Sequence, residues 1–143
     1  LIGGKTDIVM MLNGALAGLV AITAEPLTPG PITAMIIGSI GAVIMYYGTK
    51  LLESYRIDDV VGAIPVHMFA GIFGTLVVPL TNDNTSFGTQ LVGVISVCVF
   101  SFILSWISFT TLKSTIGLRI SKAAEKLGTD KAEVGVIAYS IRD

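Results

Sequence analysis

Four long stretches of the chain contain no charged residue, and the charged residues gather between them. The uncharged stretches cover residues 8–24, 26–49, 60–82 and 84–112, so their lengths run from about 17 to about 29 residues. A helix needs roughly 20 residues to cross a hydrocarbon layer of about 30 Å, and a soluble core helix rarely runs so far without a charged face. The pattern predicts an all-α, polytopic membrane helix bundle with spans at about 7–24, 32–50, 60–80 and 88–113.

The composition agrees with lipid as the solvent. Hydrophobic residues make up 52 % of the chain and charged residues 13 %, with a mean hydropathy of +0.82, whereas about 25 % of an ordinary soluble domain is charged. The single cysteine, Cys98, excludes an intrachain disulfide and a cysteine metal cluster. A net charge of −1 argues against a nucleic-acid partner.

The basic residues predict an orientation. When the four stretches are threaded in order, all of these residues fall on one side: Lys5, Lys50, Arg56, Lys113, Arg119, Lys122, Lys126, Lys131 and Arg142. By the positive-inside rule, both ends of the chain are expected in the cytoplasm, most simply at the cell (inner) membrane. Residues 1–118 then form the transmembrane region and residues 119–143 a cytoplasmic tail. Because the chain begins with Leu1, an upstream region is also expected.

Turn and cap signals fit this threading. Pro26, Pro29 and Pro31 crowd the connection between the first two stretches, which a helix interior does not tolerate. The polar run at 81–86 predicts the second external turn. Ser121 is the expected N-cap of a short helix that runs through Lys126.

The only histidine of the chain lies at membrane depth. His67 is about eight residues into the third stretch, and an ionisable side chain there usually faces a bundle interior or a water-filled path. Pro65 removes the helical donor for a carbonyl one turn earlier, while Gly71 and Gly74 are expected to leave room beside the ring. The alternative is a histidine that bonds to a neighbouring helix only for packing.

Two aspartates precede this helix. Asp58 and Asp59 stand where the third helix is expected to begin, and the helix dipole favours negative charge there. Their expected role is capping.

The residues around His67 favour binding of a small amphiphile over catalysis. A neutral imidazole accepts on one nitrogen and donates from the other, and a bare cation pays far more than the corresponding neutral amine to enter an apolar channel. No Ser-His-Asp or Cys-His pattern, phosphate loop or metal-ligand spacing is present. The sequence therefore predicts neither an enzyme nor a bound metal or other cofactor.

Three motifs, in order, resemble the ammonium transporter, methylammonium permease and Rhesus protein superfamily. They are the run Asn13–Ala24, the run Arg56–Leu76 that contains His67, and the tail from Gly117 to Tyr139. The resemblance implies ammonium or ammonia as substrate, an eleven-span fold in a lipid bilayer and a homotrimer, of which this chain holds the last four spans. The first pore histidine, the external recruitment site and the aromatic gate are then expected upstream.

The resemblance also implies roles for single residues. His67 corresponds to the second of two paired pore histidines, Asn13, Leu16 and Ala63 to pore-lining positions, and Asp59 to an acidic residue below them. In the tail, Arg119, Asp130, Glu133, Gly135 and Tyr139 match the positions through which family members communicate with a PII-type regulator. Attraction of basic residues to the inner leaflet explains the lysines of the tail equally well, so the resemblance leaves such a partner open.

Departures from the family pattern leave two functions open. Met68 stands where most members have Gly, Val60 replaces a Pro, and Val134 replaces a His in the tail. The leading hypothesis is a channel-type ammonium transporter. The alternative is an ammonium sensor that uses the same fold and signals through its tail to a partner or fused signalling domain.

Overall fold

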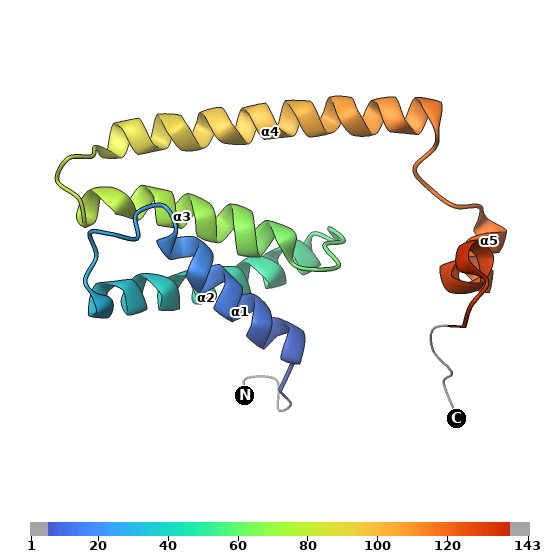
Figure 1. The fold of residues 1–143 in the computed structure, drawn as a ribbon, viewed down its shortest axis with the longest axis horizontal. Helices are drawn as coiled ribbons and strands as arrows, with labels where there is room; N and C mark the ends of the chain where they lie inside the picture. The colour runs from blue at the N-terminus through green and yellow to red at the C-terminus, as the bar shows by residue number, and fades with distance from the viewer. Residues whose placement is uncertain (1–5, 138–143) are drawn as a thin grey trace. The chain divides into compact units, whose positions relative to one another are not determined.

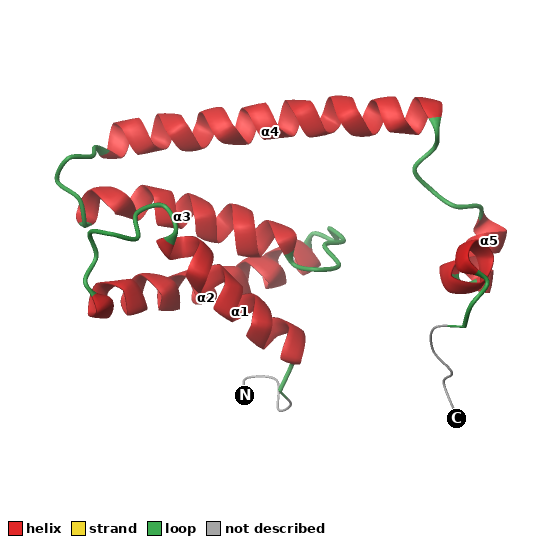
Figure 2. Cartoon of the chain, in the orientation of Figure 1, coloured by secondary structure: helices red, strands yellow, loops and turns green. Residues whose placement is uncertain are grey.

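The structure is a computed structural model that describes residues 6–137, and every regular element within that range is a helix (Figure 2). The all-α prediction is therefore confirmed. The elements in chain order are α1 (Ile8–Ile22), α2 (Pro31–Ser54), the π-helix η1 (Ile64–Phe69), α3 (Ala70–Val77), the 3₁₀-helix η2 (Val78–Leu80), α4 (Phe87–Thr115), α5 (Lys122–Leu127) and the π-helix η3 (Asp130–Val134). The chain divides into two compact units, Leu1–Val97 and Cys98–Asp143.

Within residues 6–137, two helices have the length and composition to cross a membrane. They are α2, with 24 residues, and α4, with 29. The other two apolar segments are shorter: α1 has 15 residues, and the continuous helical segment from η1 to η2 covers Ile64–Leu80. That segment begins four residues after the predicted start of the third span, because the backbone before it turns at Gly62, where φ is +75°.

Local signals account for the ends of α1 and α2. The carboxylate of Asp7 accepts a hydrogen bond from the backbone of Met10 at 3.0 Å and so caps α1. Pro31 is the first residue of α2, where its missing N–H costs nothing. At the other end, Arg56 takes a left-handed conformation with φ +57°, and Ile57 donates back to the carbonyl of Leu52. This Schellman-type ending stops α2 and reverses the chain.

In the first unit, α1, α2 and the η1–α3 helix pack against one another (Figure 1). The core cluster consists of Ala17, Met45, Val66 and Ala70, and all four are at most 2 % exposed. Two of the four, Ala17 and Ala70, are small, which allows the backbones to approach closely there. Because lipid offers little hydrophobic drive between helices, such packing supplies much of their association.

Glycines make the closest helix contacts. A Cβ atom on Gly18 would lie 3.1 Å from the carbonyl oxygen of Gly38, so α1 and α2 touch backbone to backbone. A Cβ on Gly74 would lie 2.8 Å from the carbonyl carbon of Ala21, so α3 meets α1 in the same way.

A hydrogen bond joins the two loops at one end of this unit. Glu25, between α1 and α2, accepts from the side-chain amide of Asn82, between η2 and α4, at 2.9 Å. Its other oxygen accepts from the backbone of Leu27 at 3.2 Å. The Asn82 amide is the main cause that lowers the pKa of Glu25, and the Leu27 bond adds to it.

In the second unit, the tail forms a short helical pair. The hydroxyl of Ser121 accepts from the backbone of Ala124 at 3.1 Å and caps α5, which confirms the predicted cap. The helix ends at Leu127, one residue later than expected. Gly128 (φ +94°) then separates α5 from η3, and Gly135 ends η3 with φ +73°.

Substituting Gly74 by Ala is expected to destabilise the protein by about 1–3 kcal/mol, because the added methyl group overlaps the backbone of α1. The melting temperature of the detergent-solubilised protein measures this. Gly93→Ala is the matched control, because a Cβ there meets no described atom, and in a helix interior Ala is favoured over Gly by up to about 1 kcal/mol. Equal melting temperatures for the two variants would contradict the close α1–α3 contact.

The Glu25–Asn82 bond predicts a pH dependence. Since folding lowers the pKa of Glu25 from its ordinary 4.5, the ionised form stabilises the fold above that pH and the contribution is lost as pH falls through the lowered pKa. Glu25→Gln, which offers one acceptor oxygen for two donors, is expected to melt below the wild type at neutral pH and to converge with it in acid. Asp83→Asn, which changes a neighbouring exposed carboxylate, is the control, and a constant difference across the pH range would refute the assignment.

Candidate functional site

His67 lies on an exposed face of the π-helix η1. Its imidazole takes part in no hydrogen bond with the described residues. Ala63, one turn earlier, is also exposed, and the next residue, Met68, is 44 % exposed. Pro65 and Val66, on the other face of the same turn, are buried against the core. The turn therefore holds the ring away from the α1–α2 side.

The helix is irregular where it carries this ring. In a π-helix, each N–H bonds to the carbonyl five residues earlier, and single π-turns within helices occur frequently at functional sites. Pro65 is the second residue of η1. Proline has no N–H to donate, but the carbonyl of Val61, which the sequence placed one helical turn earlier, lies in the turn before the helix, where Gly62 has a φ of +75°.

Asn13 on α1 provides a donor for that carbonyl. Its Nδ2 atom lies 3.0 Å from the oxygen of Val61. The approach depends on Gly62, because a Cβ at that position would lie 2.6 Å from the same nitrogen. Gly62 also has a φ of +75°, in the left-handed region that glycine favours.

Asp59 caps the start of η1. Its two carboxylate oxygens accept from the backbone nitrogens of Ala63 at 2.9 Å and Ile64 at 2.8 Å. The structure thus gives Asp59 the capping role expected from the sequence. Asp58 makes no hydrogen bond within residues 6–137 and is exposed.

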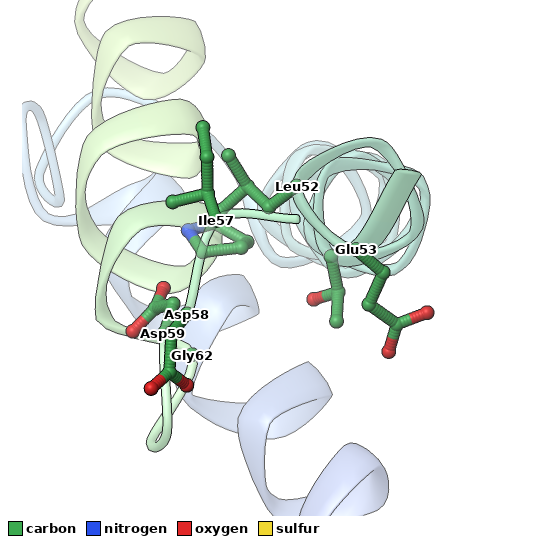
Figure 3. A pocket seen from close by; sticks show the side chains of 8 residues that line it. Leu52, Glu53, Ile57, Asp58, Asp59 and Gly62 are labelled. Carbon is green, nitrogen blue, oxygen red and sulfur yellow. The ribbon is translucent and has the colours of Figure 1, made fainter. Parts of the chain in front are cut away.

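A cleft of about 240 Å³ opens beside this cap, on the side of α2. Figure 3 shows Glu53 of α2 on one side of it and Asp58 and Asp59 on the other. The complete lining is Thr49, Leu52, Glu53, Ile57, Asp58, Asp59, Gly62 and Pro65. Glu53 forms an ion pair with Lys50 at 3.0 Å, so two of the three carboxylates already have partners.

The remaining predicted site residues are dispersed over α1 and α3. Leu16 lies one turn after Asn13 on α1 and is 47 % exposed. Gly74 is buried against the backbone of Ala21, and a Cβ on Gly71 would lie 3.6 Å from Val20. The space that these two glycines leave is thus occupied by α1. That they make room beside the imidazole remains a prediction.

The predicted tail residues lie in the second unit. Arg119 is in the exposed loop before α5, Asp130 and Glu133 belong to η3, and Gly135 ends η3. Tyr139 lies outside the described residues.

Sequence reasoning missed the link between α1 and the start of η1. Pro65 pointed to the carbonyl of Val61, but the turn at Gly62 already puts that carbonyl outside the helix, and spacing alone could not select a donor 48 residues earlier. Metal binding finds no support here, since no group of three His, Cys, Asp or Glu side chains in residues 6–137 could hold an ion.

Comparison with known proteins gives one consistent family. The model of the Ammonium Transporter Family matches residues 1–139. The chain is 37 % identical to the ammonium transporter Amt2 of Archaeoglobus fulgidus, covering 95 % of this chain and 33 % of that protein. It is 31 % identical to an ammonium transporter of Corynebacterium glutamicum (96 % and 34 %), and 32 % identical to ammonium transporter 1 of Dictyostelium discoideum (95 % and 32 %).

The chain thus spans about a third of the length of these relatives. Its two helices of spanning length, together with these matches, identify an integral membrane protein. The chain belongs to the ammonium transporter family.

Proposed function

We propose that the protein carrying this chain moves ammonium or ammonia across a membrane, and that the imidazole of His67 lines the path. The observation that carries the proposal is the exposed ring of His67, which bonds to none of the described residues and lies on an irregular turn of a predicted membrane span. The names of the family and of the relatives supply the substrate.

The chemistry of the site suits ammonia better than an alkali cation. Alkali and alkaline-earth cations prefer several oxygen ligands, and the η1–α3 surface around His67 offers none from a charged side chain. Ammonium can instead lose a proton, and the neutral amine crosses an apolar layer at much lower cost. An imidazole accepts a hydrogen bond or a proton at one nitrogen while its other nitrogen donates.

Ala63 and Leu16 complete the proposed lining with apolar surface. Both are exposed within the first unit, and Ala63 lies one turn before His67. Asn13 contributes its side chain from α1, through the bond to Val61.

The orientation and assembly are part of the same proposal. By the positive-inside rule, the basic residues favour a cytoplasmic location for both ends of the chain, and the resemblance favours a homotrimer with one path per subunit. The tail, through Arg119, Asp130 and Glu133, is then available to a PII-type regulator or to a fused signalling domain.

A second candidate function is ammonium sensing. Met68, next to His67 and 44 % exposed, places a flexible thioether where most members have no side chain. A side chain that narrows the path would allow the ion to bind without passing.

Replacing His67 by Ala tests the leading proposal. The ammonium-evoked current of the purified protein on a supported membrane is expected to fall about 10–100-fold, because one hydrogen bond to a charged group contributes about 1.5–3 kcal/mol. Ser96→Ala is the control: it removes a hydroxyl that bonds only within α4 and should keep the current.

If His67 only packs against a neighbour, His67→Ala would instead lower the melting temperature and leave the current per folded molecule unchanged. That pair of results would overturn the assignment of His67 to the path.

Replacing Met68 by Gly separates transport from sensing. If Met68 obstructs the path, Met68→Gly is expected to raise the ammonium current, while ammonium binding measured by calorimetry stays within a few-fold of the wild type. A wild type that already conducts, with no gain in the variant, would exclude the obstruction on which the sensor hypothesis rests.

A further inference from the structure

We propose that Gly48 of α2 is a positioning residue: the space left by its missing side chain receives η1, and this contact sets the direction of His67. The proposal rests on the function proposed above and deepens it, because it adds a residue that lies outside the expected lining of the path. None of the residues expected to line the path belongs to α2.

The first observation is the contact between α2 and η1. Gly48 is buried, and a Cβ atom there would overlap Cδ2 of Phe69 and would lie 2.9 Å from Cε2 of the same ring. It would also lie 3.4 Å from Cβ of Pro65. Any side chain at position 48 would therefore require the ring, or the helix that carries it, to move.

The second observation is that the backbone of Gly48 does not itself require glycine. Gly48 lies inside the regular helix α2 and is not among the glycines with a positive φ. In a helix interior, alanine is more favourable than glycine. The room that Gly48 leaves for the Phe69 ring is therefore the physical reason for a glycine on this face of α2.

The third observation is which side of η1 contacts Gly48. Phe69 follows His67 by two positions and Pro65 precedes it by two, and two positions correspond to roughly half a turn of a helix. Both contacts thus lie on the side of η1 opposite His67. Pro65 and Val66 are buried, whereas His67 is exposed. The contact with α2 therefore directs the imidazole outward without any bond to the imidazole itself.

A change at Gly48 is expected to reach His67 through the helix. Protein interiors are close-packed and transmit strain, and an added methyl group in such a place forces side chains and backbone to shift. α3, which continues η1, is held against α1 at Gly74, so the shift is expected in η1. A misplacement of about 1 Å can reduce a rate about 100-fold.

A set of glycine variants of the intact, membrane-reconstituted protein tests this. Gly48→Ala adds a methyl group that faces η1. Gly41→Ala is the matched control, because it adds the same group two turns earlier on α2, where it meets Ala21 and the carbonyl oxygen of Ala17 on α1. A double variant, Gly48→Ala with Phe69→Ala, removes the ring that the added methyl group overlaps.

Three readouts are compared with the wild type. They are the melting temperature, methylammonium uptake per folded molecule across pH, and the rate at which diethyl pyrocarbonate modifies the His67 imidazole. Mass spectrometry of the peptide that contains His67 measures the last of these, and this readout does not depend on transport.

Both single glycine variants are expected to melt several degrees below the wild type, because each added methyl group overlaps a neighbour. Only Gly48→Ala should also reduce uptake about tenfold with a changed pH profile and change the modification rate of His67. The double variant should return the pH profile and the modification rate toward the wild type, because substitutions of residues in contact do not act additively.

Two results would overturn the proposal. If Gly48→Ala matches Gly41→Ala in pH profile and modification rate, Gly48 serves packing alone. If the double variant shows no recovery, the Phe69 ring does not transmit the effect.

Two further outcomes have their own readouts. If Gly48→Ala does not fold, Phe69→Leu withdraws the ring from Gly48 with a smaller change in volume; a changed pH profile then supports the proposal, and an unchanged one refutes it. A wild type without uptake would defeat the proposed function instead. The modification rates of His67 would then decide alone whether Gly48 directs the ring.

Discussion

A backbone carbonyl inside an apolar layer must find its donor within the protein, and this constraint organises the first unit. Regular helices meet it by themselves. The helix that carries His67 begins after a turn at Gly62, and the carbonyl of Val61 in that turn has no helical donor. The carbonyl of Val61 is bonded from α1 instead. This bond ties α1 to the turn that precedes η1.

Close helix packing makes the hydrogen bond from Asn13 to Val61 possible. The amide of Asn13 is short, so it reaches Val61 only if α1 lies almost against the backbone of the neighbouring helix. Gly62 permits that approach at the bond itself, and Gly74 permits it further along α3. The small residues along the helices therefore allow the short distance at which a side chain of α1 can donate a hydrogen bond to the neighbouring backbone.

The sequence predicted the helices better than the contacts and turns that connect them. Hydropathy and punctuation identified the helical segments, Ser121 was recognised as a cap, and Asp59 was expected to cap the third helix. What the pattern could not predict was the delay of that helix to Ile64, which depends on the φ of Gly62. Nor could it predict the partners of Asn13 and Glu25, since bonds across 48 and 57 residues follow from how helices and loops meet.

The distribution of charge along the proposed path changes at the start of η1. Glu53, Asp58 and Asp59 line the cleft at the start of η1, and carboxylates there attract cations from the solvent. From Ala63 to Leu80 the helical segment carries no acidic side chain, and His67 is its one ionisable group. Under the proposed function, an ammonium ion that passed from the cleft to this segment would exchange carboxylates for apolar walls, where its charge becomes costly. Under the proposed function, the first group on this segment able to take its proton is the imidazole that the π-turn holds outward.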